Sequence, residues 1–94
     1  MSLLIHSMAE LASVVFPVLE TANCSTVTEI GAEGGGMTKL LLHFVQRQGG
    51  WMTSIDPSPS VEAEALLGNT PFGVLHRDIS IRALYICPAT DVYF

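Results

Sequence analysis

The feature that most constrains the fold is a run of β-branched residues that leads into a cluster of glycines. Residues 26–32 are typical of a buried strand, Glu29 lies within this run, and glycines follow at position 31 and at positions 34–36. Glycine suits such a turn because the backbone must reverse sharply, often with φ above zero, and because no Cβ obstructs a ligand. The helix predicted over residues 37–48 directs its free N–H groups back at the turn. The pattern predicts a strand, a turn that a ligand can approach, and a helix; we call residues 31–36 the glycine turn.

A second acid follows the next strand-like run. Asp56 comes directly after residues 51–55, which are predicted to form the second strand. In a strand-helix-strand unit the ends of the two strands lie side by side, so this carboxylate could accept hydrogen bonds from ribose hydroxyls. The alternative is an Asp-Pro turn with no ligand, since both residues are common in turns. We interpret the pair of features as a nucleotide-cofactor turn.

The rest of the chain alternates helices with strands. Apolar spacing predicts a helix over residues 4–16 that Pro17 kinks or ends. A further helix is expected to have Ser58 as its cap and Pro59 at its first position, and to run through residues 61–67. The later elements are expected to be a strand at 72–76, a helix at 80–86 and a strand at 91–94.

This alternation predicts an α/β fold, a Rossmann-like, doubly wound parallel sheet in three layers. We expect the strand at 26–32 to be central, the strands at 51–55 and 91–94 to flank it, and the strand at 72–76 to be outermost. Ligands on such sheets lie outside the carboxyl ends of the strands, where Gly31, Asp56 and Asp78 would gather.

Composition excludes several functions. The 94 residues allow one small domain, and four Lys and Arg residues with a net charge of −5 argue against a nucleic-acid partner, which needs a basic face. Cys24 and Cys87 lack metal-type spacing, and the three histidines show none either, so we expect reduced thiols, no metal site and a cytoplasmic protein. No apolar run approaches the roughly 18 residues of a membrane span, so no membrane contact is expected.

At this point the residues resemble a known family, the class I S-adenosylmethionine-dependent methyltransferases. Residues 29–35 (Glu-Ile-Gly-Ala-Glu-Gly-Gly) are similar to its first motif, an acid followed by G-x-G-x-G, although Glu33 stands where the middle glycine is expected. Residues 54–57 resemble its acidic second-strand motif, and residues 77–79 lie where the family places an acid near the adenine. Together with residues 91–94, these motifs most resemble small-molecule enzymes of the macrocin O-methyltransferase and cephalosporin hydroxylase-like type.

The resemblance implies a cofactor, S-adenosylmethionine, with S-adenosylhomocysteine as its product. It assigns Glu29 to the amino group of the cofactor, Asp56 to the ribose and Asp78 to the adenine amine, while Gly31 and Gly35 admit the methionine part. The full set of implied cofactor-binding residues is Glu29, Gly31, Ala32, Glu33, Gly35, Asp56, Ser58, Asp78 and Ile79. No catalytic residue is assigned.

The resemblance also implies the domain organisation. Residues 1–25 would form an amino-terminal helix and connector, and residues 26–94 the first half of a cofactor-binding domain, truncated after the fourth strand. We expect a small-molecule substrate for the full-length enzyme, with any divalent metal bound outside this segment, and no methyl transfer by this chain alone. An exposed strand at 91–94 and an apolar amino-terminal helix predict a homo-oligomer.

Other interpretations stay open from the sequence. A dinucleotide-binding fold of the NAD type needs G-x-G-x-x-G, a register that residues 31–36 do not give. A non-catalytic interaction or dimerisation module would also account for the high hydrophobic content of 49%. At single residues, Glu29 could instead form a salt bridge with an arginine, and Asp78 could pair with Arg77 or Arg82.

Overall fold

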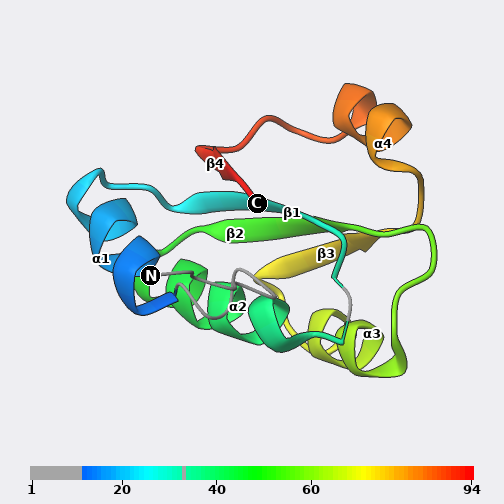
Figure 1. Ribbon diagram of the computed structural model, residues 1–94, viewed down its shortest axis with the longest axis horizontal. Coiled ribbons are helices and arrows are strands. Elements are labelled where there is room, and N and C mark those ends of the chain that lie inside the picture. Colours follow the sequence, from blue (N-terminus) through cyan, green and yellow to red (C-terminus); the bar gives the residue numbers. More distant parts are fainter. Residues whose placement is uncertain (1–11, 33) are drawn as a thin grey trace, which may run out of the picture.

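The described part of the protein contains one sheet of four parallel strands. The structure is a computed structural model, and it describes residues 12–32 and 34–94. The strands are β1 (Thr26–Ile30), β2 (Trp51–Ile55), β3 (Gly73–His76) and β4 (Val92–Tyr93), and their order across the sheet is β3-β2-β1-β4 (Figure 1). The predicted parallel pairing and the predicted strand order are confirmed.

The register of the sheet brings the loops after three of the strands to one edge. β1 and β2 pair from Thr26↔Trp51 to Ile30↔Ile55, and β2 and β3 pair up to Ile55↔His76. Beyond these pairs, the Gly31 N–H donates to the Ile55 carbonyl at 2.8 Å and the Asp56 N–H donates to the His76 carbonyl at 3.1 Å. The segments that follow β1, β2 and β3 therefore begin side by side.

Helices lie on both sides of the sheet. Figure 1 shows α2 (Gly36–Gln48) and α3 (Val61–Gly68) on one side and the short α4 (Ser80–Ile86) on the other. The first helix, α1 (Ala12–Thr21), packs against α2, where the rings of Phe16 and Phe44 stack with their centroids 5.2 Å apart. The arrangement has helices over both faces, as expected for a parallel sheet whose connections are helical. Among the described residues, none of these helices has the length and apolar character required to cross a bilayer.

The hydrophobic core lies between the sheet and α2. Its buried side chains come from the strands β1 and β2 and from the helices α1, α2 and α3. They are Leu19, Val27, Leu41, Leu42, Phe44, Val45, Met52 and Leu67. Burying such side chains is the main favourable term in folding. The core therefore fixes α2, and with α2 the turn that precedes it.

Glycine defines both ends of α2. Gly35 precedes the helix with φ 86° and Gly49 follows it with φ 71°, conformations that other residues adopt only at a cost. The Gly49 N–H donates to the Gln46 carbonyl and the Gly50 N–H donates to the Val45 carbonyl, which is the Schellman arrangement of a helix end. The predicted helix at 37–48 is confirmed, one residue longer at its start.

The predicted end of the first helix at residue 16 is wrong, and the alternative, a kink at Pro17, stays a prediction. Pro17 lies inside α1, which continues to Thr21. A proline inside a helix lacks one N–H of the helical ladder and its ring crowds the carbonyl four residues earlier, at a cost of about 3 kcal/mol, yet α1 passes through the exposed Pro17. The Thr21 hydroxyl donates to the Pro17 carbonyl at 2.9 Å. The part of the predicted helix over residues 4–11 lies outside the described residues.

The predicted cap of the third helix is also wrong. Ser60, not Ser58, is the N-cap of α3, and its hydroxyl accepts the Ala63 N–H at 3.1 Å. The difference arises because Asp56 forms its own turn: its Oδ1 accepts the Ser58 N–H at 2.8 Å and keeps Ser58 outside the helix. The first strand also ends at Ile30, two residues before the predicted position, because the glycine turn begins at Gly31.

Candidate functional site

The candidate site begins at Gly31, the first residue after the central strand β1. Gly31 has φ 83°, and a Cβ placed there would meet no atom within 4 Å. The conformation explains why glycine is preferred at this position, and the open space means that a ligand could approach the backbone closely. The Gly31 N–H also donates to the carbonyl of Ile55, the last residue of β2.

Gly35 serves a different purpose from Gly31. Its φ is 86°, but a Cβ there would lie 3.2 Å from Leu66 Cδ1 and 3.4 Å from the Ala63 backbone nitrogen. Gly35 is therefore needed for the close packing of the turn on α3, as well as for its backbone conformation. The predicted contact of Gly35 with the methionine part of a cofactor stays a prediction.

Asp56 joins the two loops of the site. Its Oδ2 accepts the Ala32 N–H at 3.0 Å, and its Oδ1 accepts the Ser58 N–H at 2.8 Å. Asp56 is partly buried, Ala32 is buried, and Ser58 is exposed. The structure thus brings three of the predicted residues together, with the carboxylate as the link between them.

Glu29 lies deeper than the glycine turn. It is 2% exposed, and its Oε1 accepts hydrogen bonds from the Thr38 hydroxyl at 2.6 Å and from the Ser54 hydroxyl at 2.9 Å. Thr38 comes from α2 and Ser54 from β2, so the carboxyl group ties the central strand to its neighbours. A ligand would have to reach Glu29 through a bridging group, and its assignment to the cofactor amino group stays a prediction.

Thr38 and Ser54 are two residues of this network that sequence reasoning missed. A buried acid needs donors, and Ser54 lies directly across from Glu29 in the register of β1 and β2. Thr38 is buried in the first turn of α2, on the face that meets the sheet. The signal that could have found them is therefore the need to satisfy Glu29, combined with strand pairing and helix periodicity.

Asp78 and Ile79 follow β3, which is separated from β1 by β2 in the sheet. Asp78 Oδ1 accepts the Ile79 N–H at 2.8 Å and lies 3.8 Å from Arg82 Nε, while Oδ2 lies 3.9 Å from His76 Nε2. The sequence left Arg77 and Arg82 as possible partners of Asp78. Arg82 is the one near its carboxylate, and Arg77 forms an ion pair with Glu64 at 2.8 Å. Ile79 is exposed. The contact of Asp78 with an adenine amine stays a prediction, and Glu33 lies outside the described residues.

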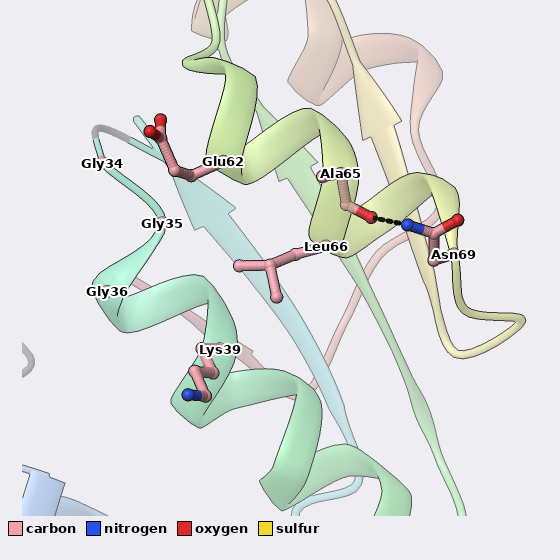
Figure 2. A pocket seen from close by; sticks show the side chains of 8 residues that line it. All are labelled: Gly34, Gly35, Gly36, Lys39, Glu62, Ala65, Leu66 and Asn69. Atoms are coloured by element: carbon pink, nitrogen blue, oxygen red, sulfur yellow. Dashed lines mark hydrogen bonds between the residues drawn. The ribbon is translucent and has the colours of Figure 1, made fainter.

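A hollow lies between the glycine turn and α3, and Figure 2 shows Leu66 of α3 pointing into the space beside α2. Its volume is about 570 Å³, and it is lined by Gly34, Gly35, Gly36, Lys39, Glu62, Ala65, Leu66 and Asn69. Neither Glu29 nor Asp56 lines it, so it is distinct from the cluster around Gly31. Its walls are mainly apolar, and Asn69 uses its side-chain amide to bond the Ala65 carbonyl at 2.8 Å.

The described part of the chain contains no group of three or more His, Cys, Asp or Glu side chains placed to hold a metal ion. The chemistry available at the carboxyl edge of the sheet consists of backbone N–H groups, an open glycine and carboxylate acceptors. Comparison with known proteins adds no assignment: no protein-family model matches the sequence, and no curated protein matches it significantly.

Proposed function

We propose that this chain is the S-adenosylmethionine-binding part of a small-molecule methyltransferase with a Rossmann-like fold. The observation that carries the proposal is the arrangement at the end of β1, where Gly31 has a left-handed conformation, faces open space and lies next to the Asp56 loop. In open parallel sheets, nucleotide cofactors bind outside the carboxyl ends of the strands at such a turn. The strand order with β1 in the interior of the sheet is consistent with this location.

The residues present are chemically suited to a nucleoside with an amino-acid tail. A carboxylate offers about four acceptor positions, and Asp56 uses two of them for backbone N–H groups, which leaves acceptors for a ribose diol. Asp78 provides a second acceptor near the end of β3 for an exocyclic amine. The open space at Gly31 allows close approach of the ligand to the backbone.

When bound, S-adenosylmethionine would supply a methyl group on a positively charged sulfur, and the neutral thioether that remains after transfer is a good leaving group. The protein residues would mainly orient the cofactor: Asp56 through the ribose, Asp78 through the adenine and Glu29 through the amino group. Orientation of this kind is a large part of catalysis in a displacement reaction. The proposal assigns no proton acceptor and no methyl acceptor within these residues.

Isothermal titration calorimetry of the 94-residue chain with S-adenosylhomocysteine, S-adenosylmethionine and NAD tests the proposal. We expect the first two ligands to bind and NAD not to bind. Asp56→Ala should weaken binding by about 10- to 100-fold, since hydrogen bonds to a charged group contribute about 1.5–3 kcal/mol. Glu20→Gln removes one exposed acid of α1 and is the matched control for charge. Tighter binding of NAD, or no binding of either methionine-derived ligand, would refute the assignment.

A second candidate is an interaction module, and one observation favours it. The apolar side chains at the end of α4 are exposed, with Tyr85 at 87% and Ile86 at 63%. Exposed apolar groups in one place are typical of surfaces that contact another protein. Light scattering at several concentrations distinguishes the candidates: a concentration-dependent mass that Tyr85→Ser abolishes would favour association, and it would stand independently of cofactor binding.

A further inference from the structure

We propose that Asp56 is a positioning residue for the glycine turn, in addition to any contact that it makes with a ribose. Its carboxylate holds the backbone of the turn against the loop after β2. Contacts between a ligand and the turn therefore depend on Asp56 even where the ligand does not touch it. The ligand-binding part of this inference rests on the proposed function, and the backbone part does not.

The hydrogen bonds of two successive residues support this role. The Gly31 N–H donates to the Ile55 carbonyl at 2.8 Å, and the next N–H, that of Ala32, donates to Asp56 Oδ2 at 3.0 Å. Residues 55 and 56 thus fix the point at which the chain leaves β1. Without the second bond, only the first would hold this point from the β2 side.

The glycine makes such an anchor necessary. Glycine has more backbone freedom than any other residue, so a turn that begins with Gly31 can adopt many conformations when it is not held. Farther along, the Gly35 N–H donates to the Ala32 carbonyl at 2.9 Å, and Gly35 packs against Ala63 and Leu66. Ala32 is therefore held on both sides, by Asp56 through its N–H and by Gly35 through its carbonyl.

The role requires a carboxylate rather than any polar side chain. Oδ1 already accepts the Ser58 N–H at 2.8 Å, so both oxygens are needed at once to hold the two loops together. An asparagine has one carbonyl oxygen and a donating amide, and the amide cannot accept the N–H of Ala32. Asp56→Asn should therefore keep one of the two bonds and lose the other, with little change in side-chain volume.

Amide hydrogen exchange followed by NMR on the ligand-free chain tests the backbone part. We expect Asp56→Ala, which removes both bonds, to accelerate exchange of the Ala32 amide by about 10- to 100-fold. Asp56→Asn should accelerate exchange at Ala32 or at Ser58, whichever N–H its single oxygen no longer accepts. The amide of Leu41, in the middle of α2, should change much less. Asp78→Asn is the matched control, since its carboxylate bonds the Ile79 N–H and not the turn. The chemical shift of the Ala32 amide proton gives a second measurement that does not depend on global stability.

The ligand part uses S-adenosylhomocysteine and its 2′,3′-dideoxy analogue, which lacks the ribose hydroxyls. If Asp56 acts only on the ribose, Asp56→Ala should not change the affinity for the analogue; if it positions the turn, that affinity should fall several-fold. Unchanged exchange and shift of the Ala32 amide in Asp56→Ala would overturn the positioning role. An unchanged affinity for the analogue would also overturn it for binding. Failure of the wild-type chain to bind either ligand would remove the proposed function, and faster exchange in Asp56→Ala would still support the anchor.

Discussion

The helices α2 and α4 both connect parallel strands of one sheet, but different interactions hold them. α2 has 13 residues, five of them buried, and glycine at both of its ends. α4 has seven residues, and of its described side chains only Ala83 is buried, whereas Leu84, Tyr85 and Ile86 are exposed. α2 is therefore an integral part of the core, whereas α4 contributes to it one small buried side chain, Ala83, among those that the structure describes.

The strands that these helices connect show the same difference. β1 and β2 pair along five residues each, and α2 closes over them. β4 has two residues, and polar contacts extend its pairing: Asp91 Oδ2 accepts the N–H groups of Ser25 and Thr26, and the Thr90 hydroxyl lies 2.8 Å from that of Thr28. Residues 12–76 thus form the packed unit, and residues 77–94 are attached to it by these hydrogen bonds and by Val92 and Phe94, which pack against the core.

The largest effect should come from exchanging aromatic residues for alanine on the two helices. Phe44 is fully buried on α2 and stacks on Phe16, so Phe44→Ala should lower the free energy of unfolding by about 3–5 kcal/mol. Tyr85 on α4 is 87% exposed, and Tyr85→Ala should change it by no more than about 0.5 kcal/mol. Urea unfolding followed by circular dichroism measures both. Similar losses for the two variants would contradict the comparison.

The glycine pair at the end of α2 should give the next largest effect. A Cβ on Gly50 would collide with the carbonyl oxygen of Ser25, so Gly50→Ala must displace backbone and should cost about 3 kcal/mol. A Cβ on Gly49 meets nothing within 4 Å, and Gly49→Ala should cost only the left-handed conformation, about 1–2 kcal/mol. Thermal unfolding of the two variants separates close packing from backbone strain. A smaller loss for Gly50→Ala than for Gly49→Ala would show that the contact with Ser25 can relax.

The buried polar network beneath α2 should give an intermediate effect. Thr38→Val removes the hydroxyl that donates to Glu29 at 2.6 Å, while Ser54 continues to donate to the same oxygen. We expect a loss of about 1–2 kcal/mol, because a buried acceptor loses one of its donors. Thr38→Ser keeps the hydroxyl and is the control. If the valine variant proves as stable as wild type in urea, the network contributes little to holding α2.

The elements of the packed unit could be predicted from the sequence because their patterns are local. The strand-like run between Gly50 and Pro57 predicted β2 at its observed bounds, and the apolar spacing of residues 37–48 predicted α2 to within one residue. The parallel order followed from alternation of strands and helices, since connections in such sheets are right-handed and adjacent elements tend to lie together.

The parts that could not be predicted depend on contacts between distant residues. From sequence, Thr38 is an ordinary polar residue at a helix start, and only its hydrogen bond to Glu29 shows that it is buried. Asp91 likewise resembles any residue at the start of a strand, although its carboxylate accepts the N–H groups of Ser25 and Thr26. Ser58 and Ser60 are equally good caps by residue type, and the Asp56 turn decides between them. For the candidate site, the sequence placed Gly31 next to Asp56 but did not show that the carboxylate bonds the turn itself.

The smallest effect should come from the carboxylate that attaches β4. Hydrogen bonds from the backbone N–H groups of Ser25 and then Thr26 lower the pKa of Asp91 below its ordinary value of 3.8. Because the folded-state pKa is the lower one, the ionised carboxylate stabilises the fold above the unfolded-state pKa, and this contribution is lost as the pH falls through the folded-state value. Asp91→Asn should therefore melt at a lower temperature than wild type near neutral pH, and the two melting temperatures should converge as the pH is lowered well below 3.8. Asp78→Asn serves as the control, because Asp78 precedes α4 in the sequence whereas Asp91 follows it. A gap between Asp91→Asn and wild type that stays constant across this range would show that the carboxylate holds β4 by shape rather than by charge.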